Sequence, residues 1–352
     1  MTAASPSSSG RRLVVVAGSG RSGTSLFTGL AGRLGLYIPK PEVAANKSNP
    51  RGFSEPRWAV DFNEALLKKT SVNIDDGRPE AWDITGALAE DDAVRGELAA
   101  WLKEQFAESD RIIVKDPRLA WFLALYRAAS AELGAEVNVV SMVRHPAEVL
   151  KSREIAYGKG LTATARAAGW LNVMLTIEKL TRDDRRAIVR YDELLADWRP
   201  TMERADAAMD LQLFARATSE EIAGAGDLVD SSLRRSLSSL DELGLPPRLA
   251  DLATRAHDTL ADLAGEAGAE TEATRKRLDD LHEEYDAYFD ECVTVAQSAI
   301  GAARREARVN TARRVRKEIA REQEEQQAAE RAGASDGSLS FAQRAVRRLR
   351  GS

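Results

Sequence analysis

The chain has 352 residues, of which 43% are hydrophobic, and its 50 Lys and Arg against 55 Asp and Glu give a formal net charge of -5. That length and apolar content allow a full α/β core with residues left over. The single cysteine, Cys292, excludes an internal disulfide and suits a reducing cytosol. No apolar run approaches the roughly 20 residues that span a bilayer, and the acidic balance argues against nucleic-acid binding. We therefore expect a cytoplasmic protein that does not bind nucleic acid.

The beginning of the chain predicts a short leader followed by a strand. Residues 1–11 are rich in Ser and lack the basic start and apolar centre of a signal peptide, so they predict a disordered leader. The apolar run at residues 13–17 predicts a buried β-strand. Further apolar runs at residues 112–114, 137–143 and 188–189 alternate with helical patterns. Such alternation predicts an α/β fold of three layers, a central parallel sheet flanked by helices.

Residues 18–25, directly after the first strand, read Gly-Ser-Gly-Arg-Ser-Gly-Thr-Ser. A P-loop has Gly, four free positions, Gly, Lys and Ser or Thr, because its N–H groups cradle phosphates while the Lys reaches the β- and γ-phosphates. Both glycines and the hydroxyl of Ser25 are present, but Thr24 stands in place of the Lys and the positive charge is at Arg21. We expect a loop that binds a phosphate-like anion but holds Mg-ATP poorly. Its predicted ligand-binding residues are Gly20, Arg21, Ser22, Gly23, Thr24 and Ser25.

A second anion-binding signal lies at the end of the predicted strand 137–143. Arg144 ends this strand, and Pro146 favours the first turn of a helix that follows. Ser152 lies about two turns along that helix. Arg144 and Ser152 can therefore face one anion beside the switch from strand to helix. We expect His145, between them, to have a structural role.

Taken together, these segments resemble the PAPS-dependent sulfotransferases, and within them the bacterial branch. The 5′-phosphosulfate loop of that family has a basic residue followed by Ser-Gly-Thr, as at Arg21, and its 3′-phosphate site pairs an Arg with a Ser eight positions on, as at Arg144 and Ser152. Five further segments are similar in family order: residues 49–55, residues 114–119, Trp170 with Asn172, residues 191–195 and residues 230–235. The resemblance covers about residues 12–240.

The resemblance implies an enzyme that transfers a sulfuryl group in line from PAPS to a hydroxyl or amine of an acceptor. Positioning and charge stabilisation would do most of the catalytic work, with Arg21, Lys115 and the loop amides facing the sulfonate and bridging oxygen. No metal is required, and no two histidines have metal-ligand spacing. The acceptor is open among carbohydrates, glycolipids and small hydroxylated metabolites, and we expect it to bind at residues 53–82 and 157–170.

The general base differs from that of the animal cytosolic members, which carry a Lys-x-His segment. Here Lys115 is followed by Asp116 and a proline. Glu55, in a Gly-Phe-x-Glu segment, is in a position that resembles the catalytic glutamate of tyrosylprotein and some bacterial sulfotransferases, and Asp116 is the second candidate. Two structural roles stay open: Glu55 as a carboxylate at a helix entry, and Asp116 as the partner of the Arg118 side chain.

The Arg-Lys-Gly segment that covers the 3′-phosphate in animal members is also missing. Arg234 and Arg235 could take over part of its role, because a pair of arginines can hold a phosphate bidentately. The alternative for these two residues is a solvated helix face.

Two other functions explain parts of the pattern. A P-loop nucleotide or small-molecule kinase would explain the loop, but it should also have the loop Lys and a metal-holding Asp. A non-catalytic PAPS-binding module would explain the loop and Arg144 without a need for Glu55 or Lys115.

The C-terminal part of the chain predicts helices. We expect the sulfotransferase-like domain to span residues 12–300 and to be helical from about residue 246, where Ala, Glu, Arg and Leu dominate. Residues 301–352 hold thirteen Lys and Arg against seven Asp and Glu and predict a charged tail. We expect a helix to about Ala329, a break at residues 333–340 and a short basic helix. This tail could contact anionic lipid or a partner protein, or be a solvated or coiled-coil segment, and the sequence does not indicate the oligomeric state.

Overall fold

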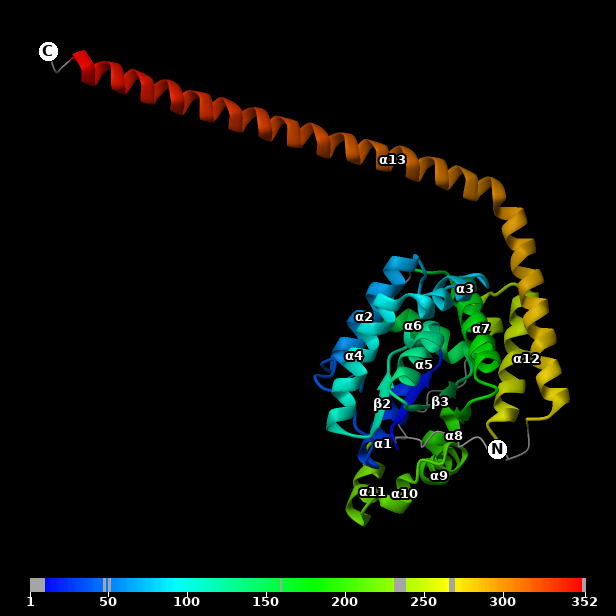
Figure 1. The fold of residues 1–352 in the computed structure, drawn as a ribbon. Helices are drawn as coiled ribbons and strands as arrows, with labels where there is room; N and C mark the ends of the chain where they lie inside the picture. Colours follow the sequence, from blue (N-terminus) through cyan, green and yellow to red (C-terminus); the bar gives the residue numbers. More distant parts are fainter. Residues whose placement is uncertain are drawn as a thin grey trace, which may run out of the picture. The chain divides into compact units, whose positions relative to one another are not determined.

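The computed structural model describes residues 10–46, 49, 52–158, 160–230, 239–265 and 270–349 (Figure 1). The chain divides into two units, Met1–Phe289 and Asp290–Ser352. Residues 1–9 of the predicted leader lie outside the described residues, and so do Arg234 and Arg235.

Four parallel strands form the centre of the first unit: β1 (Arg12–Ala17), β2 (Arg111–Lys115), β3 (Glu136–Val143) and β4 (Arg185–Arg190). Their order in the sheet is β2-β1-β3-β4, and all neighbouring strands are parallel. Nearly all positions of β1 and β3 are buried because both faces of the sheet are covered, which explains their continuous apolar runs. The predicted α/β fold with a central parallel sheet is confirmed.

Helices cover both faces of this sheet (Figure 1). Before residue 247 these helices are α1 (Thr24–Arg33), α2 (Arg57–Thr70), α3 (Ala81–Gly86), α4 (Asp92–Glu108), α5 (Leu123–Glu132), α6 (Pro146–Tyr157), α7 (Ala163–Leu180), α8 (Tyr191–Ala196), α9 (Trp198–Met209), α10 (Leu213–Arg216) and α11 (Ser219–Gly226). One apolar cluster joins alternate strand residues such as Leu13 and Val15 to α2, α4 and α5, and a second joins Val14 and Val16 to α1 and α9. Short 3-10 turns lie at Ala87–Glu90, Leu119–Phe122 and Asp241–Leu243.

The last two helices are α12 (Pro247–Leu263) and α13 (Glu272–Leu349). A third apolar cluster contains Leu252 of α12, Leu281 of α13 and Leu171 of α7, all 2% exposed or less. It shows that α12 and the beginning of α13 belong to the core of the first unit. The first of these two helices, α12, begins at Pro247.

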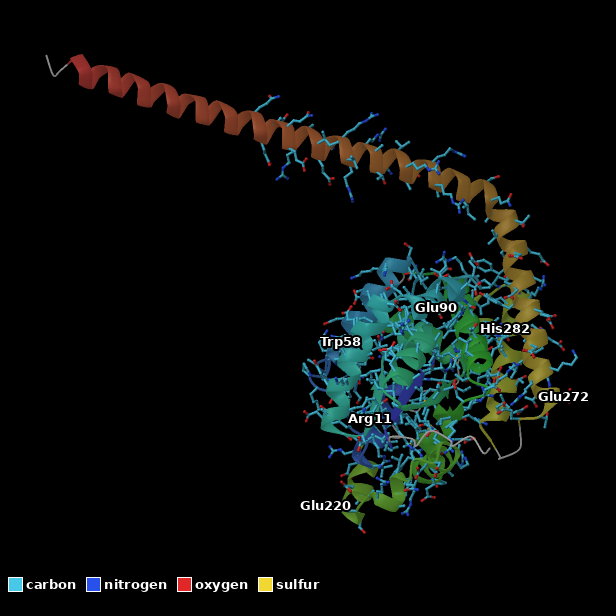
Figure 2. All side chains as sticks on the ribbon, viewed as in Figure 1. Arg11, Trp58, Glu90, Glu220, Glu272 and His282 are labelled. Carbon is cyan, nitrogen blue, oxygen red and sulfur yellow. The ribbon has the colours of Figure 1, made fainter. Side chains whose placement is uncertain are left out.

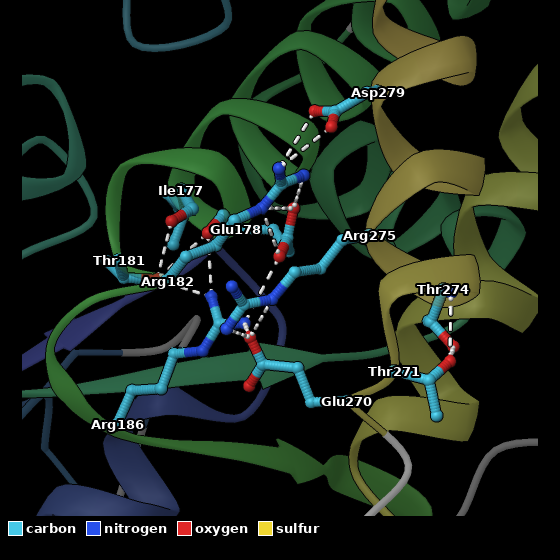
Figure 3. A network of polar contacts seen from close by, with 10 residues as sticks. All are labelled: Ile177, Glu178, Thr181, Arg182, Arg186, Glu270, Thr271, Thr274, Arg275 and Asp279. Atoms are coloured by element: carbon cyan, nitrogen blue, oxygen red, sulfur yellow. Dashed lines mark hydrogen bonds and ion pairs between the residues drawn. The ribbon is translucent and has the colours of Figure 1, made fainter.

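A network of ion pairs also ties the beginning of α13 to this unit (Figure 3). Glu178 of α7, 2% exposed, accepts hydrogen bonds from Arg182 and from Arg186 of β4. Arg182 in turn pairs with Asp279 of α13 at 2.9 Å, and Arg186 pairs with Glu270 just before α13 at 2.9 Å. Because the buried Glu178 has two cationic partners, its charge is compensated within the core.

The part of α13 in the second unit is built differently. It continues as helix to Leu349, and the side chains of residues 302–325 are exposed (Figure 2). The expected break at residues 333–340 is wrong, because this segment contains no proline and each of its two glycines costs a helix only about 1 kcal/mol relative to alanine. In the part of the chain that the structure describes, no helix combines the length and apolar character needed to cross a membrane.

Candidate functional site

The site is built around the loop between β1 and α1. Gly18, Arg21 and Gly23 have φ angles of 136°, 74° and 91°, so the loop turns through the left-handed region three times. At Gly23 a side chain is excluded, since a Cβ there would lie 2.1 Å from a ring carbon of Tyr191. A left-handed arginine is a strained conformation of the kind found at ligand sites.

This loop has the features of an anion site. Gly23 is the N-cap of α1, and the first turn of that helix has no acidic residue. The Oγ atoms of Ser19 and Ser22 are buried, and neither has a hydrogen-bond partner among the described residues. A phosphate or sulfonate oxygen would satisfy such hydroxyls, and the N-terminal end of α1 would favour its charge.

The residues predicted from the second segment meet this loop. Arg144 Nη1 donates to the Arg21 carbonyl at 2.9 Å, and Arg21 Nε donates to Ser152 Oγ at 3.1 Å. Arg144 also pairs with Glu148 at 2.8 Å and lies 4.4 Å from the centre of the Tyr191 ring. The parallel pairing of β1 with β3 explains this convergence, because it brings the carboxyl ends of both strands to one edge of the sheet.

A carboxylate and an ammonium lie on the other side of the loop. Lys115, the last residue of β2, contacts Glu55 in an ion pair whose members are 2% and 7% exposed. Lys115 Nζ also lies 3.3 Å from Ser25 Oγ and 3.4 Å from the Phe53 carbonyl oxygen. Glu55 lies two residues before α2, and its carboxylate contacts the Lys115 ammonium. Lys115 thus lies between the Glu55 carboxylate and Ser25, the second residue of α1.

Asp116 has the contacts of a structural carboxylate. It is fully buried and accepts hydrogen bonds from Asn63 Nδ2 at 3.0 Å and from the Arg118 backbone and side chain at 3.2 and 2.9 Å. Burial raises the pKa of Asp116 above its ordinary value, the Arg118 charge opposes this, and the nearby Glu55 adds to it. These contacts match the structural alternative, in which Asp116 holds the Arg118 side chain.

His145 is the N-cap residue of α6 and contacts His257 of α12, with the ring centres 4.9 Å apart. Burial lowers the pKa of His145 below its ordinary value, and the neighbouring His257 lowers it further. This packing between α6 and α12 agrees with the structural role expected for His145.

Three residues near the site carry contacts that the motifs do not reveal. Arg153, next to Ser152, donates from Nε to the Gly20 carbonyl at 3.1 Å and forms an ion pair with Asp75. Tyr191 packs on both Gly23 and the Arg144 guanidinium. Tyr191 stands in a segment quoted for the resemblance, but neither Arg153 nor Asp75 belongs to any such segment.

Asn172, which is part of the resemblance, holds the segment where we expect the acceptor. Its Nδ2 donates to the carbonyls of Asp76 and Arg78 at 3.0 Å each, and its Oδ1 accepts from Trp82 Nε1 at 3.0 Å. One amide on α7 therefore fixes both ends of residues 76–82.

Comparisons with known proteins give two partial likenesses. The family model of the flagellar FliJ protein matches residues 247–336, which hold α12 and part of α13. The sulfotransferase domain from the Synechococcus PCC 7002 olefin synthase is similar with a TM-score of 0.37 and 17% sequence identity, over 77% of this chain and 94% of that chain. No curated protein matches the sequence. A TM-score of 0.37 is too low to support an argument, so the fold described above rests on its own strands and helices.

Proposed function

We propose that this protein is a sulfotransferase that moves a sulfuryl group from PAPS to a hydroxyl or amine of an acceptor. The observation that carries the proposal is the meeting of Arg21, Arg144 and Ser152 at one end of the sheet, with hydrogen bonds of 2.9 and 3.1 Å. Two motifs far apart in the sequence supply these residues. The buried hydroxyls of Ser19 and Ser22 support an anionic ligand at the same loop.

The residues of the site divide between holding the donor and assisting transfer. The loop residues Gly20, Arg21, Ser22, Gly23, Thr24 and Ser25 would hold the 5′ side of PAPS, and Arg144 with Ser152 the 3′-phosphate. Arg234 and Arg235 stay proposed contacts to that phosphate. When bound, PAPS supplies the sulfuryl group and leaves as adenosine 3′,5′-bisphosphate.

The transfer itself needs one base and one source of positive charge. The acceptor oxygen bonds to sulfur while the bond from sulfur to the bridging oxygen breaks, and Glu55 takes the acceptor proton. Arg21 and Lys115 stabilise the negative charge that grows on the bridging oxygen. Glu55 is the stronger candidate for the base because Asp116 is fully buried and engaged by Asn63 and Arg118.

For the acceptor we propose a chemical class and a binding segment, and no single compound. Carbohydrates, glycolipids and small hydroxylated metabolites all have a hydroxyl group that Glu55 would deprotonate. We propose that they bind at residues 76–82, the segment held by Asn172. The basic tail of residues 301–352 is a proposed contact for anionic lipid or a partner protein, and a cytoplasmic location stays a prediction.

Isothermal titration with adenosine 3′,5′-bisphosphate, adenosine 5′-monophosphate and Mg-ATP tests the donor site. We expect the bisphosphate to bind most tightly and Arg144→Ala to weaken it roughly 10- to 100-fold, the effect of losing a charged hydrogen bond. Arg255→Ala is the matched control, because Arg255 is exposed on α12 and pairs with Asp251 and Glu284. Tighter binding of Mg-ATP would favour a kinase and sink the proposal.

Transfer from labelled PAPS to panels of the three acceptor classes tests the enzyme. Glu55→Gln should keep bisphosphate affinity and lower the rate about 10²- to 10⁴-fold, as expected for loss of a general base. Bisphosphate binding without transfer to any class, in the wild-type protein, would instead indicate a non-catalytic binding module.

A further inference from the structure

Arg153 joins two segments that are far apart in the sequence. Its Nε donates to the carbonyl of Gly20 at 3.1 Å, and its Nη1 forms an ion pair with Asp75. The Arg153 and Asp75 side chains are 5% and 14% exposed, so this pair is largely removed from water. One guanidinium on α6 thus connects the loop after β1 with residues 73–78.

The contact to Gly20 bears on the direction of the loop's N–H groups. A trans peptide points its C=O and its N–H to opposite sides, so a carbonyl held by Arg153 directs the N–H of Arg21 away from Arg153. The approach is close, since a Cβ on Gly20 would lie 3.1 Å from Arg153 Nη2. The next carbonyl, that of Arg21, is held in the same way by Arg144.

The other end of the connection is a firmly held turn. Asp76 accepts hydrogen bonds from the backbone N–H groups of Asn73 and Arg78 at 3.2 and 3.0 Å. The Asp75 carbonyl oxygen lies where α7 can carry only glycine, because a Cβ on Gly169 would be 2.3 Å from it. Asp75 is therefore a fixed anchor, and the position of Arg153 follows from it.

We infer that Arg153 is a positioning residue that couples the 5′-phosphosulfate loop to the turn at residues 73–78, on the acceptor side. The inference rests on the proposed function. A ligand bound to the loop restricts the motion of Arg153 and, through Asp75, that of the turn at residues 73–78. Conversely, a restricted turn holds the loop in the conformation that binds the donor. Binding on the two sides is then mutually supportive, as linkage requires.

Two ligands that differ only in the 5′-phosphate test the positioning of the loop. The affinity ratio of adenosine 3′,5′-bisphosphate to adenosine 3′-monophosphate reports the contribution of that phosphate. We expect Arg153→Met to lower this ratio roughly tenfold, since a charged hydrogen bond behind the loop is lost. Affinity for the 3′-monophosphate should change little, which a general structural defect would not reproduce.

A double variant separates this role from stability. Arg153→Met alone leaves the buried Asp75 without its partner, whereas Arg153→Met with Asp75→Leu removes both charges and is expected to restore the urea midpoint toward that of the wild type. The affinity ratio should stay low in the double variant. Arg255→Met, on exposed Arg255, is the control and should leave the ratio unchanged.

Amide hydrogen exchange tests the coupling. The bisphosphate should slow exchange at residues 73–78 in the wild-type protein and not in the double variant. An unchanged affinity ratio in both Arg153 variants would overturn the inference, and unchanged exchange in the wild-type complex would overturn the coupling. A wild-type protein that binds neither nucleotide would overturn the proposed function itself, so the two failures are distinguishable.

Discussion

The two parts of α13 are helical for different reasons. Up to Phe289 the helix buries Leu278, Leu281 and Tyr285, which are 2% exposed or less, and Tyr285 donates a hydrogen bond to the Ala168 carbonyl at 3.1 Å. From Asp290 on, the helix has no such core among its described side chains, and Val295 is 88% exposed. One continuous element thus combines a part stabilised by tertiary packing with a part that depends on local interactions.

The difference shows what a helical pattern in the sequence means. The apolar spacing before residue 290 reflects burial, which supplies most of the stability of helices in globular proteins. After residue 301, helix-forming Ala, Arg and Glu maintain the helix, together with ion pairs one turn apart such as Arg314 with Glu318 at 3.6 Å. A mutation should therefore cost much more in the first part than in the second.

The largest expected effect comes from Leu281→Ala. Leu281 is 2% exposed in the cluster formed by α7, α12 and α13, and truncating it should lower the free energy of unfolding by about 2–5 kcal/mol. Urea unfolding followed by tryptophan fluorescence measures this, because the first unit contains all six tryptophans.

Val295→Ala is the control for that comparison. Val295 is 88% exposed, and its truncation should change the free energy of unfolding by no more than about 0.5 kcal/mol. Equal losses for the two variants would show that residues beyond Phe289 share the core, and the two parts of α13 would then be stabilised in the same way.

A smaller effect is expected from acidification, and only in the first unit. All three histidines lie there. Burial is the largest cause that lowers the pKa values of His145 and His282 below 6.5. The unfolded chain then binds more protons than the folded chain below 6.5, so stability is fully present above this pH and falls as the pH drops through the folded pKa values. Urea unfolding across this range, down to about pH 5.5, measures the slope.

His145→Gln and His282→Gln should each flatten this dependence, because each removes one group that must give up its proton on folding. A peptide of residues 290–349 contains no histidine, so its helicity by circular dichroism should not follow the same curve. An unchanged slope in both histidine variants would contradict the assignment of the effect to these two side chains.

The sequence predicts most of the site because its chemistry is local. The order of residues 18–25 is enough to indicate an anion loop, and the eight-residue step from Arg144, just after β3, to Ser152 of α6 is enough to indicate a second pair of anion contacts. Parallel pairing of β1 with β3 then brings them together, and an α/β fold makes that pairing expected.

What the sequence does not predict depends on contacts between distant segments. Nothing next to Asp75 or Arg153 marks them as partners, since they are joined only after α6 and the turn at residues 73–78 have packed. The continuity of α13 through residues 333–340 was mispredicted for another reason. Glycine and serine lower helix propensity without ending a helix, so the composition of residues 333–340 indicates a less stable stretch of helix and not a helix end.

The smallest expected effect tests the local interactions of the second unit. Arg321 and Glu325 form an ion pair at 2.8 Å with side chains 79% and 64% exposed, so Glu325→Gln should lower the stability of the helix by at most about 0.5 kcal/mol. Circular dichroism of the peptide of residues 290–349 measures the change, and about 1 M salt should abolish it by screening. Glu322→Gln is the matched control: four residues before Glu322 stands Glu318, so the substitution removes a like-charge neighbour and should leave helicity equal or higher. If both substitutions lowered helicity alike, the ion pairs would not explain why this part of α13 is helical, and contacts with another molecule would become the better explanation.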